Sequence, residues 1–194
     1  MNAKEAIKNS LKILLFFTLL TGIVYPLIIF VIGQVVYNNK ANGSLINEGG
    51  IVVGSRLLGQ KFTGNKYFWS RPSSIDYNPM PSGGSNLSLT SKVLVQQYDD
   101  NRAAFMKANL LKDTLDVPSE MLFASASGVD PDISKESAYV QVKRISDARK
   151  FNQALRTRLY KLIDSQLKSR QLGLFGEEVV NVLELNLKLD EMSK

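Results

Sequence analysis

The chain has 194 residues, 44% of them hydrophobic, which is enough for one domain with its own core and one further element. It contains no cysteine and no histidine, which excludes disulfides, thiolate nucleophiles and the usual general base near neutral pH, so we expect no catalytic residues and no metal site. The net charge is +6, but half of that excess lies in the first forty residues beside an apolar run, which favours a membrane-orienting segment over a nucleic-acid-binding surface.

An uncharged run extends from Ile13 to Val36. As a helix it would be roughly 36 Å long, against a hydrocarbon core of about 30 Å, so the sequence predicts one tilted transmembrane helix. The alternative is a cleaved signal peptide. Its apolar region would be too long, and no pair of small residues at a cleavage spacing follows the run.

The lysines around this run predict its orientation. Three lysines lie in residues 1–12, whereas Lys40 alone follows the run closely. The positive-inside rule then predicts a cytoplasmic N-terminus over residues 1–12, a membrane helix over 13–36 and an extracytoplasmic domain over 37–194.

The run also contains small and polar residues that a simple anchor does not need. Glycine permits close helix packing, and threonine or glutamine can hydrogen-bond between helices in lipid. Proline leaves a backbone carbonyl without its usual donor, a cost that a neighbouring helix can relieve. We therefore predict contacts to a partner helix, the alternative being that glycine and proline are simply common in membrane helices. The candidate residues are Thr21, Gly22, Pro26 and Gln34.

Turn-rich sequence follows the run. We predict a short strand at 51–55, an aromatic cluster at 67–69 and a long loop over 77–86, a kind of loop that is usually functional or disordered. Within the loop, 81–86 is weakly similar to the Leu-Ser-Gly-Gly-Gln signature of transport ATPases, although a tight turn is the commoner origin of such small residues. The nucleotide candidates are therefore weak: Ser82, Gly83, Gly84 and, further along, Gln141.

Helical spacing prevails after residue 87. We predict one helix over 89–110, a second that begins at Asp132 or Ser134, and a third around 155–167 that is ended by Gly173. Strict alternation over 183–189 predicts a final strand with one buried face. The fold class is thus a small α+β extracytoplasmic domain anchored by one N-terminal transmembrane helix.

Two charged groups are given structural interpretations. Asp130 and Asp132 have no third acidic neighbour, so helix capping explains them better than a bound cation does. The basic pairs 143–144 and 149–150 are expected to form a solvated edge of the second helix.

Eight segments, in order over nearly the whole chain, carry a resemblance to one family. The chain resembles the C subunit of the Kdp potassium-transporting ATPase, although it departs from the usual residues of that family at Ser70, Ala126, Asp132 and Glu178–Val179. The segments are 19–27, 41–45, 54–60, 67–73, 82–87, 124–131, 141–145 and 181–187.

The resemblance implies a non-catalytic accessory subunit of a high-affinity potassium uptake pump in the plasma membrane. Its expected partners are a channel-like potassium-translocating subunit, a P-type ATPase subunit and a small single-span subunit. ATP is expected to be used by the ATPase subunit, with no cofactor in this chain. The alternative that the family implies is a catalytic chaperone that binds nucleotide directly. Candidate partner contacts in the domain are Tyr67, Trp69, Arg71, Gly83, Gly84 and Asn86.

Overall fold

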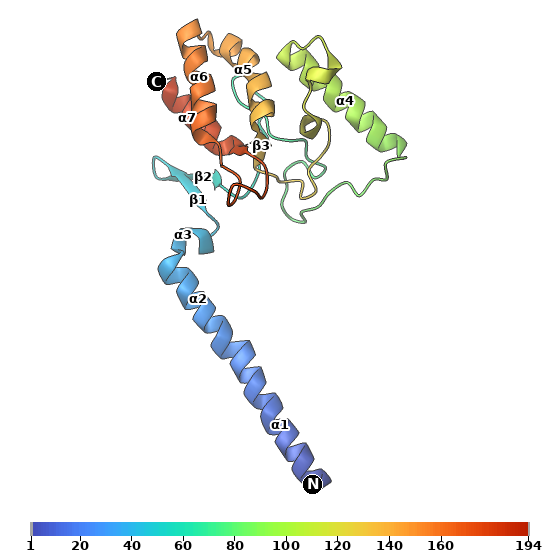
Figure 1. The fold of residues 1–194 in the computed structure, drawn as a ribbon, viewed down its shortest axis with the longest axis vertical. Helices are drawn as coiled ribbons and strands as arrows, with labels where there is room; N and C mark the ends of the chain where they lie inside the picture. The colour runs from blue at the N-terminus through green and yellow to red at the C-terminus, as the bar shows by residue number, and fades with distance from the viewer. Residues whose placement is uncertain (1, 194) are drawn as a thin grey trace. The chain divides into compact units, whose positions relative to one another are not determined.

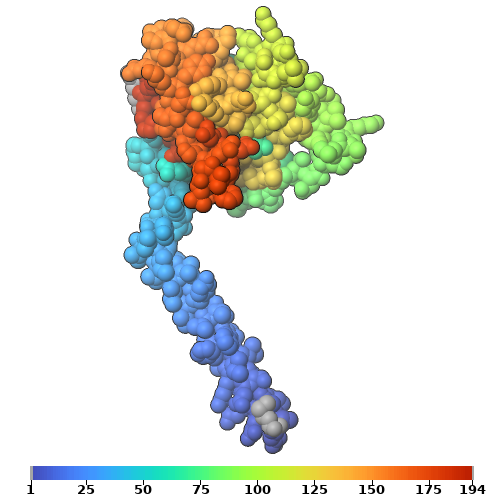
Figure 2. All heavy atoms as spheres, in the orientation of Figure 1, coloured from blue at the N-terminus to red at the C-terminus, as the bar shows by residue number. Residues whose placement is uncertain are grey.

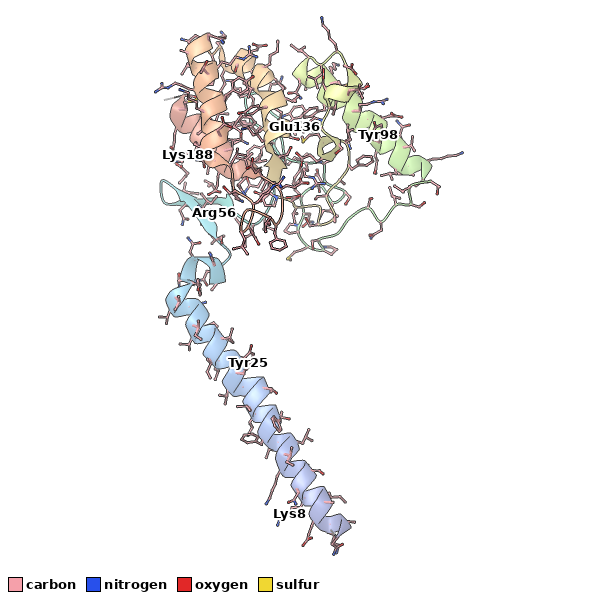
Figure 3. The ribbon with its side chains drawn as sticks, in the orientation of Figure 1. Lys8, Tyr25, Arg56, Tyr98, Glu136 and Lys188 are labelled. Atoms are coloured by element: carbon pink, nitrogen blue, oxygen red, sulfur yellow. The ribbon has the colours of Figure 1, made fainter. Side chains whose placement is uncertain are left out.

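The computed structural model describes residues 2–193, and its N-terminal unit, which ends at Leu45, is mainly helical over the described residues (Figure 1). From Ala3 to Val36 the chain forms a helix that is long and apolar enough to cross a membrane, and the protein buries none of its apolar window. Figure 3 shows Lys8 and Tyr25 projecting outward from this helix. The predicted apolar helix is confirmed, although it begins at Ala3, before the uncharged run. Its elements are α1 (Ala3–Leu19), the π-helical turn η1 (Leu20–Val24) and α2 (Tyr25–Val36), followed by the short α3 (Asn38–Ala41).

Pro26 shapes the middle of this helix. Proline has no N–H to donate, and its ring crowds the preceding turn. Directly before Pro26 the helix widens into η1, in which the N–H of Tyr25 donates to the carbonyl of Leu20. Such π turns are among the local adjustments by which membrane helices accommodate proline. Part of the adjustment that we assigned to a partner helix therefore occurs in the helix itself.

The second unit, Ile46–Lys194, is the C-terminal domain. It is entered through a hairpin of β1 (Leu45–Glu48) and β2 (Ile51–Ser55), which confirms the predicted strand at 51–55. Gly49 and Gly50 join the strands with φ of 57° and 86°, the left-handed backbone that a tight two-residue hairpin requires.

Four helices and one further pair of strands form the rest of the domain (Figure 1). α4 (Lys92–Asn109) lies within the predicted range 89–110, and the residue that caps its C-terminus, Leu110, adopts a left-handed conformation. Two 3-10 turns follow it, η2 (Thr114–Asp116) and η3 (Ser119–Met121). The remaining elements are β3 (Asp132–Ser134), α5 (Lys135–Arg149), α6 (Gln153–Gln166), β4 (Val179–Asn181) and α7 (Val182–Met192).

The core lies where α5, α6 and α7 pack on the β3–β4 pair. These strands are antiparallel, with Ile133 opposite Val180, and both side chains are fully buried. The α+β class is therefore confirmed. Other fully buried core residues are Phe68, Ala138, Val142, Ile145, Leu159, Ile163, Leu185 and Leu189.

The prediction of a strand over 183–189 is wrong, because this segment is the helix α7. Its alternating leucines satisfy a period of two, but the buried residues Val182, Leu185, Asn186 and Leu189 recur at the spacing of three and four that one face of a helix requires. The Asn181 side chain caps the helix by accepting a hydrogen bond from the N–H of Glu184 at 3.1 Å.

The predicted end of the third helix at Gly173 is also wrong. α6 ends at Gln166, because Leu167 is extended and the N–H of Lys168 donates to the carbonyl of Val179 at 2.8 Å. Pairing with β4 thus takes the chain out of the helix. Gly173 belongs instead to a tight turn further on.

Of the two proposed caps for the second helix, Ser134 is correct. Its Oγ accepts a hydrogen bond from the N–H of Ser137 at 3.1 Å, at the start of α5. Asp132 lies in β3, where its carboxylate pairs with Lys168 at 2.9 Å. Asp132 is therefore a structural residue, though not a cap.

Candidate functional site

The segment 67–71, which carries three predicted partner contacts, lies between α5 and α7. Its backbone has no strand beside it, so side-chain amides satisfy its polar groups. The N–H of Phe68 donates to Asn186 Oδ1 at 2.8 Å, and Asn186 Nδ2 donates to the Phe68 carbonyl at 3.0 Å. In the same way the N–H of Trp69 donates to Gln141 Oε1 at 2.7 Å, and Gln141 Nε2 donates to the Trp69 carbonyl at 3.3 Å. The side-chain amides of Asn186 and Gln141 thus make the backbone hydrogen bonds that a neighbouring strand would otherwise make to this segment.

Arg144 completes this polar cluster, and it corrects the expectation of a solvated basic edge. Its side chain is buried and stacks on Trp69, with the guanidinium carbon 4.3 Å from the ring centroid. It donates to Asn109 Oδ1 at 3.0 Å and to Gln141 Oε1 at 2.7 Å. Burial lowers the pKa of Arg144 to about 10, so the group remains charged near neutral pH. A buried charge is stable only when it has several hydrogen-bond partners, and these contacts supply them to Arg144.

The second basic pair is likewise not simply solvated. Arg149 pairs with Asp190 at 2.6 Å, and its guanidinium lies 5.1 Å from the centroid of Tyr67. The Tyr67 hydroxyl donates to the same carboxylate at 3.2 Å. Tyr67 is therefore joined to α5 and α7. Lys143 and Lys150, the other members of the two pairs, are exposed as expected.

Arg71 and Tyr77 connect this segment to the long loop. Arg71 Nη1 donates to Asp130 Oδ2 at 2.8 Å, so the partner of Asp130 is an arginine side chain and not a bound metal cation. The Tyr77 hydroxyl donates to the Arg71 carbonyl at 2.5 Å. Burial, with a smaller effect of the Asp76 charge, raises the pKa of Tyr77 to about 12, so the phenol stays a neutral donor.

The two glycines of the loop differ in their surroundings. Neither has a positive φ, so neither is required for a left-handed turn, whereas Asn86 does adopt φ of 52°. A Cβ on Gly84 would lie 3.0 Å from the carbonyl oxygen of Ala126, but a Cβ on Gly83 would meet nothing within 4 Å. Gly84 thus packs closely on its own chain, and Gly83 faces open space.

The predicted nucleotide residues are not brought together by hydrogen bonds within the described residues 2–193. Gln141 is fully buried and has four hydrogen bonds, to Trp69, Ser137 and Arg144. The N–H of Gly83, the kind of group that cradles phosphate, donates to the Ser127 carbonyl at 3.1 Å. Ser82 is exposed. A ligand of Gln141 or of the Gly83 amide would have to displace these bonds.

A cavity of about 320 Å³ lies where the loop meets α4. Its lining is mixed, with Ser73, Ser74 and Ser85 on the loop side and Leu94 and Asn101 on α4. Among residues 2–193 there is no group of three or more acidic side chains suited to a metal ion.

The predicted contacts in the N-terminal helix have local partners of their own. The Thr21 hydroxyl donates to the Phe17 carbonyl at 2.7 Å, one turn back. Gln34 Oε1 accepts from Asn38 and Asn42 at 3.2 Å each, which ties the end of α2 to the turn after it. Gly22 faces open space, with nothing within 4 Å of a Cβ placed there. Their role as partner contacts stays a prediction.

Comparison with known proteins decides the family. The family model described as "KdpC: K+-transporting ATPase, c chain" matches residues 7–191. This chain belongs to the KdpC family. The resemblance inferred from the eight segments is therefore confirmed.

Curated relatives in this family match over almost their whole length. The chain is 40% identical to the potassium-transporting ATPase KdpC subunit of Caldanaerobacter subterraneus subsp. tengcongensis, with 98% of this chain and 97% of that protein covered. It is 41% identical to the KdpC subunit of Geotalea uraniireducens, with 98% and 100% covered. It is 44% identical to that of Acidobacterium capsulatum, with 95% and 99% covered.

Sequence reasoning missed the residues that hold the site of this KdpC-family chain together. Asn109 and Asn186 are buried amides, the first on a predicted helix and the second on a segment that was predicted as a strand with one buried face. One signal was available, since asparagine at a core-facing position of a helix is costly unless it has a hydrogen-bond partner. The partners are the backbone of Phe68 for Asn186 and the Arg144 guanidinium for Asn109. Both are distant in sequence and were not identifiable from the spacing.

Proposed function

We propose that this chain is a non-catalytic accessory subunit of an ATP-driven potassium uptake pump. In this proposal it supports assembly and activity of a channel-like subunit and a P-type ATPase subunit, while ATP is hydrolysed by the latter. The observation that carries the proposal is that the family match covers both units, the apolar helix and the C-terminal domain. The saturated polar cluster around Gln141 supports it, because these groups hold the fold and none is poised to act on a substrate.

We place the C-terminal domain outside the cytoplasm. The helix from Ala3 to Val36 exposes its apolar side chains and therefore needs lipid or a partner helix around it. Lysines cluster before its apolar run, and the positive-inside rule keeps that end in the cytoplasm. Because ATP is cytoplasmic, this placement supports a subunit that binds no nucleotide.

A thiol-labelling experiment tests the placement. The chain has no cysteine, so a single introduced one is a unique label. Ser134 is unsuitable because it caps α5, whereas Leu115 is 89% exposed on η2. We expect an impermeant thiol reagent to label L115C in intact cells, and to label the control N2C at the other end of the helix only after lysis. The reverse pattern would refute the topology and favour direct nucleotide binding.

We also propose that the loop around Gly83 docks onto the channel-like subunit. A leucine at Gly83 has room in the isolated chain, because no atom lies within 4 Å of its Cβ position and φ is negative. We expect G83L to melt within a few degrees of the parent protein, yet to lower recovery of the assembled pump or its potassium uptake. Thermal unfolding and co-purification from mild detergent measure the two effects.

The control for this prediction is S119L, which adds the same side chain at an exposed position on η3. It is expected to change neither melting nor assembly. Normal assembly and uptake by G83L would end the docking proposal. Gly84 is not suitable for this test, because its close contact with Ala126 would confuse folding with docking.

A further inference from the structure

A turn within residues 167–178 of the C-terminal domain presents three large apolar side chains to the surroundings. Leu172, Leu174 and Phe175, which we call the apolar tip, are 88%, 78% and 62% exposed. Backbone hydrogen bonds close the turn, because Gln171 and Phe175 each donate to the other's carbonyl at 2.9 Å. Figure 2 shows this part of the chain, in orange-red, at the surface of the domain.

The backbone of the tip is unusual for its residues. Leu172 has φ of 53° and Gly173 has φ of 72°. A left-handed conformation is costly for leucine, and no burial of its side chain within this chain offsets the cost. The turn therefore keeps the Leu172 side chain exposed, and the left-handed backbone of Leu172 lowers the local stability.

The base of this turn is fastened beside the start of the hairpin through which the chain enters the domain. Lys168 pairs with Asp132 at 2.9 Å, and Asn181 Nδ2 donates to the same carboxylate at 3.2 Å. Asn181 Nδ2 also donates to the carbonyl of Arg56 at 2.9 Å, directly after β2. In this hairpin β2 runs antiparallel to β1, so the end of β2 lies beside the start of β1. Arg56, the residue directly after β2, therefore lies close to the start of β1.

The start of β1 is in turn tied to the apolar helix by a short linker. Only residues 37–44 separate α2 from β1, which at full extension limits their separation to about 28 Å. The linker is not extended, because it contains α3 and because Gln34 bonds to Asn38 and Asn42 across it. The beginning of β1 must therefore lie close to the bilayer that surrounds the helix.

We propose that Leu172, Leu174 and Phe175 insert into the interfacial layer of the bilayer that holds this chain's own helix. The tip has the apolar area that such insertion requires, and the linker keeps its base within reach of lipid. The charges near it nearly balance, with Arg170 before the turn and Glu177 and Glu178 after it. Insertion is therefore apolar and does not depend on anionic lipid. This inference goes beyond the proposed function and holds on whichever side of the membrane the domain lies.

The test uses the full chain in nanodiscs of phosphatidylcholine. A single cysteine at Leu174 carries a polarity-sensitive fluorophore, and a lipid bearing a spin label acts as the quencher. We expect the L174C label to emit at shorter wavelength and to lose most of its intensity to the quencher. The matched control is L115C, which also replaces an exposed leucine, 89% exposed against 78% for Leu174, but lies on η2. Its label is expected to stay unquenched, and equal quenching at both sites would overturn the proposal.

Two further arms separate insertion from its alternatives. Adding anionic lipid should leave quenching at residue 174 unchanged, and quenching that required anionic lipid would replace apolar insertion with surface attraction. Adding the other pump subunits should leave it unchanged as well. A label that is shielded from both lipid and aqueous quenchers only in the complete pump would show a protein contact and overturn the proposal. Unfolding of L174C at the parent temperature confirms that the fold is intact.

Discussion

Replacing Arg144 with methionine is expected to destabilise the C-terminal domain by about 3–5 kcal/mol. Methionine fills much of the same space, but it removes the donor to the Asn109 oxygen and to the Asn65 carbonyl. Gln141 Oε1 and the Gly64 carbonyl each lose a donor as well, although both keep a bond from Trp69. It also removes the cation that stacks on Trp69. For a chain of this size the loss corresponds to a fall in melting temperature of roughly 6–20 °C.

The control for Arg144 is its neighbour. K143M removes a basic residue from the same helix, but Lys143 is exposed and pairs with Asp147, at 2.9 Å and one turn away. Such a pair contributes about 0.3–0.5 kcal/mol, so little change is expected. Thermal unfolding of both full-length variants in the same detergent makes the comparison. Equal melting temperatures for R144M and K143M would show that the buried cluster does not hold the fold.

Replacing Gly59 with alanine is expected to cost about 3 kcal/mol. Gly59 is buried, and a Cβ there would overlap the carbonyl oxygen of Asp130 and lie 3.1 Å from the carbonyl carbon of Val129. These atoms are backbone and cannot rotate away. Moving them would break the hydrogen bond from Gly59 N–H to Val129, which is 2.7 Å long, and would disturb the ion pair between Asp130 and Arg71.

The matched control for Gly59 is G83A, which adds the same methyl group where nothing lies within 4 Å. It is expected to change stability by no more than about 0.5 kcal/mol. Hydrogen exchange of the 127–131 backbone should quicken in G59A and stay unchanged in G83A. If G59A were as stable as the parent protein, the backbone at Gly59 and the backbone at 129–130 would be free to move apart, which would contradict this prediction.

Helices that have one clear period were predictable from local sequence. The uncharged run predicted the N-terminal helix, and helical spacing predicted α4 close to its true bounds and α5 from its start. Ser134 was one of two caps considered for α5, and the structure selects it because only its side chain reaches the N–H of Ser137. In each case the deciding interactions lie within a few residues along the chain.

Local pattern failed where distant segments decide the outcome. The leucines of residues 183–189 alternate as in a strand, yet the segment forms the helix α7. Its helical face, which includes Val182 and Asn186, is buried against other segments of the domain. The third helix stops early because Lys168 pairs with Val179, eleven positions onward. Neither competing contact is visible from the periodicity of the segment itself.

The sequence alone determined the family, the apolar helix, the α+β class and the lack of histidine and cysteine chemistry. These follow from composition and from motifs that are each contiguous in the chain. Only the tertiary structure decided that Gln141 and Arg144 are buried supports of Trp69 rather than a ligand site and a solvated edge. The physical reason is that a polar side chain is stable inside a domain only with hydrogen-bond partners. Two of those partners here, Trp69 for Gln141 and Asn109 for Arg144, lie more than thirty residues away along the chain.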